Sequence, residues 1–328
     1  MAGLAEWDVH GRVHTLKTEF AEWDLGLEQW RASQSYTLVR FRPDGAISEN
    51  EHHNPDGSIS RSNFIYDAEG RIREAQFGMN DGPVGKSLYF YDDRERLTRV
   101  VDVHKDGTER ESETYSYDQN GKRTKTYFVS KHLVNAFMYS IEGTTQSYGA
   151  EGASTITTRY DHRGKPDEVL FHDADQRLLR RVVFTRDGAG RLTTEELYLG
   201  EESPSPNIVF GPNSVLSSTS YTYDAKGRIL ERRTRTGELG DHRTTFGYDE
   251  HGNPADESHE DISREMQIDE AGVLQAMKET SSTQNVRFEY QYDAQGNWQE
   301  RVVWIRRVPN PNFERSNITR REITYYAG

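Results

Sequence analysis

The sequence predicts an all-β protein in which antiparallel hairpins coil into a barrel-like or spiral β-shell. Three observations predict it: a turn motif that recurs along the chain, strands with aromatic residues two apart beside it, and an unusual composition. Hydrophobic residues account for 33% of the 328 residues, and the 27 glycines raise this to about 41%, below the roughly 45–50% of soluble globular domains. The chain nevertheless holds 18 tyrosines. These numbers favour a thin, half-exposed shell over one thick aliphatic core.

The motif is Tyr-Asp-x-x-Gly-Arg followed by an aliphatic residue. Its clearest copies are Tyr66–Ile72 and Tyr223–Ile229, and looser or weaker copies keep the aspartate. Most copies have glycine three residues after that aspartate, with Glu95 and Gln176 as the exceptions. Repetition at one fixed spacing indicates a repeat architecture. The repeat residues given a structural role are Tyr66, Asp67, Gly70, Arg71, Tyr91, Asp92, Tyr117, Asp118, Gly121, Tyr160, Asp161, Tyr223, Asp224, Gly227, Arg228, Tyr248, Asp249, Tyr292 and Asp293, with weaker copies beginning at Trp7, His172, Arg186 and Ile268.

Each copy is typical of a β-hairpin turn. An aspartate at the start of the turn bonds the backbone N–H two residues on, and glycine supplies the positive φ of a type I turn closed by a G1 bulge. In that register Asp67 faces Arg71 and Tyr66 faces Ile72, so each hairpin has one charge pair and one aromatic–aliphatic pair. Aromatic residues two apart, as in Tyr221 and Tyr223, lie on one face of a strand.

The repeats form one array over residues 1–328, which we treat as a single domain. Residues 1–60 carry degenerate copies, and Asp-Gly turns at Asp44, Asp56 and Asp106 lie between the main ones. Neighbouring turns are often 11 to 14 residues apart, which fits strands of about five to seven residues. Three stretches break this rhythm and are expected to be loop excursions: 76–87, 140–154 and 200–214.

Composition excludes several classes of protein. No apolar run is long enough for a transmembrane helix, and the first residues lack the basic and apolar regions of a signal peptide. The chain has no cysteine, so disulfides and thiolate metal sites are absent. The net charge of −13 opposes nucleic-acid binding, which requires a basic surface.

No catalytic, cofactor or metal site is predicted. The 11 histidines show no metal-ligand spacing; His52 and His53 lie on opposite faces of a strand, and the cluster Glu257, His259, Glu260 and Asp261 is more typical of a solvated loop than of a cation site. A glycosidase needs two carboxylates about 5–10 Å apart in a cleft, and an acidic sheet offers such pairs by accident. The motif aspartates are poor candidates because the turn uses their oxygens.

Tryptophan and tyrosine have two interpretations. Aromatic rows stack on sugar rings or hold an extended peptide, but tyrosine before each aspartate also packs the inner face when aliphatic residues are few. We favour the packing role for the tyrosines. The residues predicted as ligand contacts are Trp7, Trp23, Trp30, Trp298 and Trp304.

The repeated motif resembles the YD repeat of the Rhs and teneurin-type family, over nearly the whole chain from Trp7 to Trp298. In that family, long arrays form a spiralling antiparallel sheet that closes into a hollow shell around a toxin polypeptide or presents an adhesive surface. The chain has no Asp-Pro dipeptide, so the core segment before the family's variable effector, with its self-cleaving aspartates, has no match. The resemblance implies a short stand-alone member in a bacterial secretion, envelope or toxin-associated setting.

The function expected from these observations is non-enzymatic: a β-shell that binds or encapsulates a polypeptide or carbohydrate. A glycan-processing hydrolase on the same sheet is the alternative from another class. It predicts a cleft with two close carboxylates that are not motif aspartates. A third interpretation, a structural fragment of a larger Rhs-type toxin, predicts unpaired sheet edges. The sequence leaves the oligomeric state open.

Overall fold

A computed structural model describes residues 4–80, 82–129, 137–141, 144–148, 152–200, 214–237, 239–268 and 274–327. Among these residues the only helix is a short 3₁₀ segment, η1, at Leu4–Trp7. The rest of the secondary structure is β. The strands are β1 Val13–Asp24, β2 Gln29–Phe41, β3 Ile47–His53, β4 Ile59–Tyr66, β5 Ile72–Met79, β6 Gly82–Tyr91, β7 Leu97–His104, β8 Glu109–Tyr117, β9 Arg123–Phe128, β10 Phe137–Ile141, β11 Thr144–Tyr148, β12 Thr155–Tyr160, β13 Pro166–His172, β14 Leu178–Arg186, β15 Leu192–Leu199, β16 Val215–Tyr223, β17 Ile229–Thr236, β18 Gly240–Tyr248, β19 Pro254–Ile268, β20 Leu274–Tyr292, β21 Trp298–Arg307 and β22 Glu314–Tyr325.

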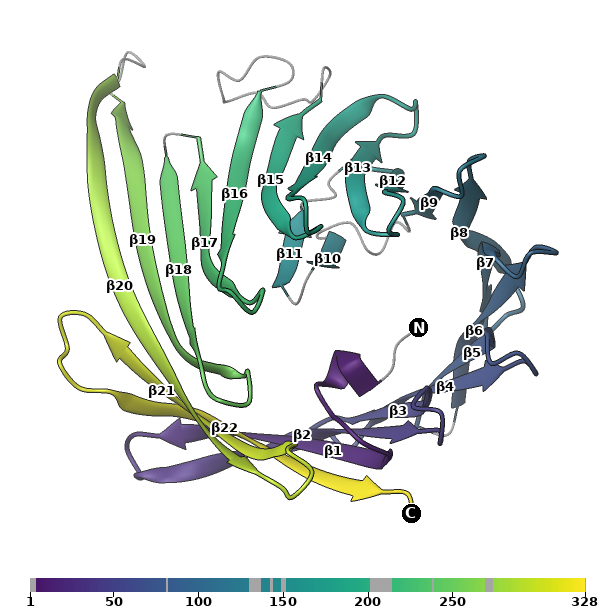
Figure 1. The fold of residues 1–328 in the computed structure, drawn as a ribbon, viewed down its shortest axis with the longest axis horizontal. Helices are drawn as coiled ribbons and strands as arrows, with labels where there is room; N and C mark the ends of the chain where they lie inside the picture. The colour runs from purple at the N-terminus through teal and green to yellow at the C-terminus, as the bar shows by residue number, and fades with distance from the viewer. Residues whose placement is uncertain are drawn as a thin grey trace.

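Twenty of these strands form one antiparallel sheet that closes into a barrel (Figure 1). Each strand pairs with the one before it and the one after it, β9 pairs with β12, and β22 pairs with β1 to close the ring. β10 and β11 pair only with each other. The all-β shell predicted from the repeat is therefore confirmed, and its closure is that of a barrel. The unpaired edges expected of a fragment are not seen in this sheet, because every one of its strands has two neighbours.

Apart from the weak copy at Asp173, the motif turns between described strands lie at one end of the barrel, which we call the motif rim. Because strand direction alternates around the ring, every second connection lies at the same end. The other connections, including the Asp-Gly turns at Asp56 and Asp106 and the weak copy at Asp173, lie at the opposite rim. The two-rim arrangement follows directly from an array in which motif turns alternate with plainer turns.

The motif hairpins have the predicted register. Tyr66 pairs with Ile72, the Asp67 N–H donates to the Arg71 carbonyl at 2.9 Å, and Gly70 has a φ of +79°. Glu95 and Gln176 adopt the same left-handed conformation, with φ of +63° and +62°. The turn is thus kept at both positions without glycine.

A second irregularity follows the turn in most motif hairpins. One extra residue is inserted just after the aliphatic position, as at Arg73 between Ile72 and Glu74. The same shift occurs after Ile47, Leu97, Pro166, Leu192, Ile229, Pro254 and Trp298. The hairpin from Tyr117 to Arg123 lacks it. Because a bulge bends a strand and increases its twist, this repeated insertion supplies curvature that the sheet needs in order to close.

Substitutions at the glycine position test the shared turn. Gly227 has a φ of +84° and nothing within 4 Å of the place a Cβ would occupy, so Gly227→Val should lower the free energy of unfolding by about 1–3 kcal/mol through backbone strain alone. Glu95→Val should lower the free energy of unfolding by a smaller amount, because Glu95 already has a Cβ in that backbone conformation. Urea unfolding measures both changes. Equal losses would contradict a common turn geometry.

One expected loop is wrong. Residues 76–87 belong mostly to strands, because β5 continues to Met79 and β6 begins at Gly82. Extended pairing across Phe77 and Gly85 outweighs the glycine content that suggested a loop. The loop expected at 140–154 is wrong in part, because its first two residues belong to β10 and Thr144–Tyr148 is β11, whereas 142–143 and 149–151 lie outside the described residues. Nearly all of 200–214 lies outside the described residues.

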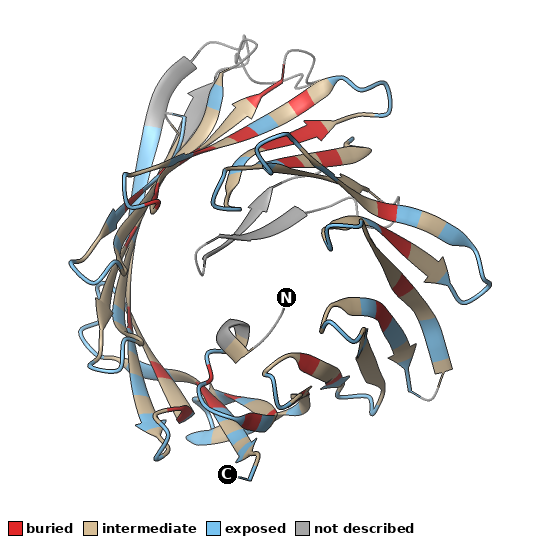
Figure 2. Cartoon of the chain, turned by 45° about the vertical axis from the view of Figure 1, so that its right-hand side comes forward, coloured by how far each residue is buried: buried red, intermediate tan, exposed pale blue. Residues whose placement is uncertain are grey.

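The inner face of the barrel is identified by η1, which lies within the ring in Figures 1 and 2. Leu4 and Trp7 pack against a buried cluster that contains Leu16, Val39 and Phe41, so these side chains point inward. A second buried cluster lies at the other side of the ring. Its members are Ile156, Val169, Phe171, Val182, Phe184, Leu192 and Tyr221.

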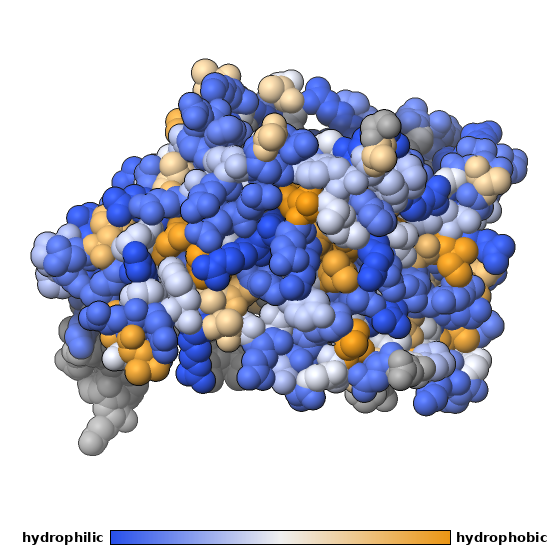
Figure 3. Space-filling view, turned by 90° about the horizontal axis from the view of Figure 1, so that it is seen from below, coloured by the Kyte–Doolittle hydropathy of each residue, from blue (hydrophilic) through white to orange (hydrophobic). Residues whose placement is uncertain are grey.

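The outer wall is largely hydrophilic. Figure 3 views it from below, over the strands at the bottom of Figure 1, and shows scattered hydrophobic residues among polar ones. Ion pairs bridge neighbouring strands on this wall, for example Arg243 to Glu231 at 2.7 Å and Arg159 to Glu168 at 2.6 Å. None of the helical segments that the structure describes is long and apolar enough to span a membrane.

Candidate functional site: the inner wall

The inner wall is held together by the motif residues themselves. Each motif aspartate accepts hydrogen bonds from its own turn: in one copy Asp224 Oδ1 accepts from the Lys226 and Arg228 N–H groups, and Oδ2 accepts from Arg228 Nε at 2.7 Å. Asp67, Asp92 and Asp187 repeat this pattern. In these four copies both carboxylate oxygens are therefore bound by the residues of the turn.

Five motif tyrosines link their hairpin to the preceding hairpin at the motif rim. The hydroxyl of each donates to the backbone carbonyl at the aliphatic position of that hairpin, and an arginine of that hairpin lies over the tyrosine ring. Tyr91, for example, donates to the Ile72 carbonyl at 2.9 Å and lies under Arg71 at 4.9 Å. Tyr66, Tyr117, Tyr223 and Tyr248 make the same bond to Ile47, Leu97, Leu192 and Ile229. Such a hydrogen bond contributes about 0.5–1.5 kcal/mol, so these links stabilise the shell through many small contributions.

The tyrosine hydroxyl has a different acceptor where asparagine replaces the motif arginine. Asn253 and Asn297 are too short to cover the motif carboxylate, and the next tyrosine takes that place instead. Tyr292 donates to Asp249 Oδ2 at 2.5 Å, and Tyr325 donates to Asp293. Burial, followed by the bond to the aspartate, raises the pKa of both tyrosines. The last two motif hairpins are thus joined side chain to side chain.

The motif carboxylates predict an acid limit to stability. The side chain of Arg96 holds the pKa of Asp92 below its usual range, and the backbone N–H groups of Arg191 and Arg228 do the same for Asp187 and Asp224. A lowered pKa in the folded chain gives stability that is complete above the ordinary aspartate pKa of about 3.9 and is lost as pH falls through the lowered values. The urea midpoint should therefore fall below about pH 4, and less steeply in Asp224→Asn. A midpoint unchanged between pH 5 and pH 3 would contradict this.

The N-terminal segment, residues 4–12, lies against the inner wall like a bound peptide. Arg321 donates to the Trp7 and Asp8 carbonyls at 3.1 and 3.2 Å, and Trp298 Nε1 donates to Asp8 Oδ2 at 2.9 Å. Asn297 forms two hydrogen bonds with the backbone of His10: its Oδ1 accepts from the His10 N–H at 2.7 Å, and its Nδ2 donates to the His10 carbonyl at 2.9 Å. Three side chains of the wall thus hold this segment, mostly through its backbone.

The Arg321 side chain is half-buried against the inner wall. It lies over the Trp298 ring at 3.4 Å, and burial lowers the pKa of Arg321 to about 10. The side chain remains charged at neutral pH and supplies fixed donors to peptide carbonyls inside the shell. A guanidinium has five N–H groups and no acceptor, so such a position selects backbone or side-chain oxygens.

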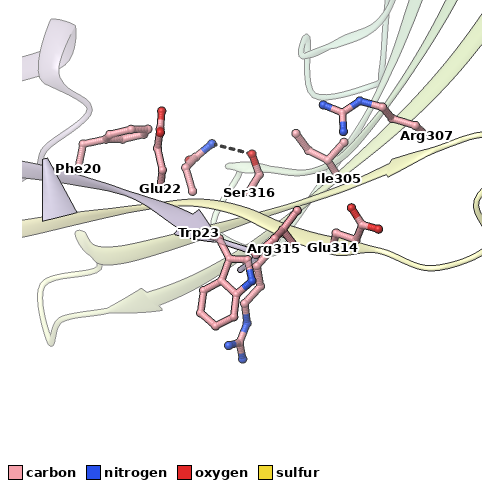
Figure 4. A pocket seen from close by; sticks show the side chains of 10 residues that line it. Phe20, Glu22, Trp23, Ile305, Arg307, Glu314, Arg315 and Ser316 are labelled. Atoms are coloured by element: carbon pink, nitrogen blue, oxygen red, sulfur yellow. Dashed lines mark hydrogen bonds between the residues drawn. The ribbon is translucent and has the colours of Figure 1, made fainter. Parts of the chain in front are cut away.

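Two adjoining hollows open on the inner wall near the opposite rim, with volumes of about 230 and 560 Å³. They share Phe20 and Glu22. Arg31 lines one of them, and Arg307 lines the other. In Figure 4 Phe20, Glu22 and Ile305 point to one side of the sheet, whereas Trp23 and Arg315 point to the other. Phe20 is 40% exposed, so an apolar surface flanked by charges is open to the interior. No motif marks these residues, so the sequence does not predict this surface.

The five tryptophans predicted as ligand contacts are not brought to one site: Trp7 and Trp298 lie on the inner side of the wall, whereas Trp23, Trp30 and Trp304 lie near one another on the outer side. Trp298 is 5% exposed and engaged by Asp8 and Arg321, and Trp7 packs on the cluster of Leu16 and Phe41. Trp23 and Trp30 stack edge to face across the first hairpin at 5.0 Å. Trp304 lies beneath Arg287 and Arg315. Ligand contact at these residues stays a prediction.

The histidine cluster lies on a strand instead of in a loop. Glu257, His259 and Asp261 alternate along β19 and share one face. His259 bonds Glu257 at 3.0 Å, His242 of β18 bonds Asp261, and Thr244 lies between the two imidazoles. Among the described residues no group of three or more histidine, aspartate and glutamate side chains is placed to hold a metal ion.

Several carboxyl groups of the wall are unsuited to the role that the hydrolase alternative requires. A general acid at neutral pH needs a raised pKa. The pKa values of Glu51, Glu74 and Asp241 are instead lowered. These carboxylates are held in the ionised form by arginine, lysine and amide partners.

Comparison with known proteins identifies the repeat. The model of the teneurin YD-shell family matches residues 133–303, more than half of the chain. The chain belongs to the teneurin YD-shell family. No curated protein sequence matches this YD shell.

Two solved structures are similar to the YD shell at low identity. One is the crystal structure of a TcdB2-TccC3-Cdc42 complex, with 12% identity, a TM-score of 0.27, and coverage of 86% of this chain and 19% of that one. The YD shell thus spans about a fifth of that relative's length. The other is a porin-like protein from Bacteroides uniformis, with 9% identity, a TM-score of 0.35, and coverage of 95% and 96%.

Proposed function

We propose that this YD shell is a non-enzymatic module that holds a polypeptide in its interior. The observation that carries the proposal is the seat of residues 4–12. Arg321 and Asn297 bind the backbone of this segment, and backbone groups are common to every polypeptide. A carbohydrate offers no such repeating N–H and carbonyl pair, so the inner wall favours a polypeptide over a glycan.

The size of the interior supports the same function. The accessible surface is 19653 Å², whereas a compact protein of 37.8 kDa has about 13,800 Å². The excess is expected of a wall with two accessible sides. Barrels of about 16–18 strands already enclose an aqueous channel, and this ring has 20. An extended segment fits such a space alongside residues 4–12.

The test uses the full chain with a flexible peptide fused to it. A recognition sequence for a site-specific protease is placed a few residues ahead of residue 1, next to the segment that lies inside the ring. The control carries the same sequence after residue 328, beyond Tyr325 at the motif rim. Slower cleavage of the N-terminal fusion is expected, because the wall shelters it, and unfolding in urea should abolish the difference. Equal cleavage rates in the folded protein would overturn the proposal.

A further inference from the structure

We propose that the outer wall carries a binding surface for an acidic polypeptide segment, formed by a row of stacked arginine and aromatic side chains. The row crosses five neighbouring strands near the opposite rim. Its members are Trp30 of β2, Trp23 of β1, Arg315 of β22, Trp304 and Arg306 of β21, Arg287 of β20 and Phe313 of the β21–β22 turn. The surface is separate from the interior and does not depend on the function proposed above.

The geometry of the row alternates cations and rings. Arg315 lies 4.7 Å from the Trp23 ring centre and 5.2 Å from that of Trp304. Arg287 follows over Trp304 at 5.7 Å and over Phe313 at 4.9 Å, and Arg306 ends the row over Phe313 at 5.1 Å. Trp23 and Arg315 belong to the residues around the smaller hollow, but in Figure 4 their side chains point to the opposite side of the sheet from Phe20 and Glu22, which places the row on the outer side.

Two of these arginines lack the carboxylate partners that other outer-wall arginines have. Arg243, Arg159 and Arg320 each lie within 3.0 Å of a carboxylate oxygen. Within the described residues no ion pair joins Arg306 or Arg315 to a carboxylate, whereas Arg287 has a longer ion pair with Glu289, at 3.7 Å. In a chain of net charge −13, three clustered arginines with one such pair among them are a local excess of positive charge, which an acidic group from solution can neutralise.

The chemistry of the row selects carboxylates. A guanidinium presents a planar fork of N–H donors, and that fork matches a carboxylate in a bidentate pair. Guanidinium groups already lie over the rings of Trp23, Trp304 and Phe313, which leaves a sugar ring less open surface on which to stack. Arg315 and Arg287 are two strands apart, about 9.6 Å, a span that an extended peptide covers in about three residues. A segment with aspartate or glutamate at that spacing fits the row.

The experiment measures binding of fluorescein-labelled deca-glutamate to the full-length chain by fluorescence anisotropy. The row variant carries Arg287→Gln, Arg306→Gln and Arg315→Gln. The matched control carries Arg159→Gln, Arg243→Gln and Arg320→Gln, which removes the same charge from paired positions on the outer wall. Circular dichroism and the thermal midpoint establish that both are folded. Dextran sulfate serves as a second probe.

Deca-glutamate should bind the natural chain, and its affinity should fall when salt is added. The row variant should lose about tenfold or more in affinity, and the control less than about threefold. If the row variant does not fold, a version with lysine at the same three positions replaces it and should still bind more weakly than the natural chain, because lysine lacks the planar fork. Absence of binding, equal loss in row and control variants, or binding of dextran sulfate but not of deca-glutamate would overturn the proposal.

Discussion

Phe171→Ala is expected to lower the free energy of unfolding by about 3–5 kcal/mol. Phe171 is 1% exposed and packs on the inner face with Val169, Val182 and Phe184. Truncation removes a large apolar side chain and leaves a cavity that its neighbours fill only in part. A shell has little buried apolar volume elsewhere to compensate, so the loss should fall at the upper end for a single substitution. Urea unfolding followed by far-ultraviolet circular dichroism measures it.

Phe77→Ala is the matched control. Phe77 is the same residue type in a strand of the same barrel, but it is 40% exposed. Its truncation should change the unfolding free energy by less than about 1 kcal/mol. If both substitutions cost the same small amount, the cluster around Phe171 does not anchor that side of the ring.

The hairpins were predictable because their information is local. A tyrosine, an aspartate and a glycine within five residues determine the turn, and the turn determines that Tyr66 faces Ile72. The alternation of strand direction then places all such turns at one rim. Glu95 is instructive: its turn is kept against its own backbone preference, because the neighbouring strands hold the register.

The candidate site was less predictable because it depends on contacts between distant residues. Trp298 pairs with Asp8, and no local pattern indicates that residues 4–12 return to the wall formed by β21 and β22. Phe20 was missed for a similar reason, since its exposure results from the hollow between strands that meet only when the ring closes. The tryptophans were chosen by residue type alone, and burial at Trp298 and stacking at Trp304 followed from their neighbours.

Asn297→Leu is expected to lower the free energy of unfolding by about 2 kcal/mol or more. Asn297 is 1% exposed, and leucine has a similar volume but no polar group. The substitution leaves two groups without their partner, the His10 N–H and the His10 carbonyl. Each unsatisfied group that is withdrawn from water costs about 1–3 kcal/mol. The Tyr325 hydroxyl loses the bond from Asn297 Nδ2 but retains its bond to Asp293. The His10 amide should also exchange with solvent faster, because its acceptor is gone.

Asn253→Leu distinguishes this effect from the general cost of changing the motif. Asn253 occupies the same position of the preceding motif hairpin, but its side-chain amide donates only to the Tyr292 hydroxyl, at 2.7 Å, and that hydroxyl is also bound to Asp249. Asn253→Leu should lower the free energy of unfolding by about 1 kcal/mol. The exchange rate of the His10 amide should not change. Equal losses at the two positions would mean that Asn297 contributes only to its own turn. Residues 4–12 would then not be held by the wall through that side chain, and the main evidence that the interior binds a polypeptide backbone would be lost.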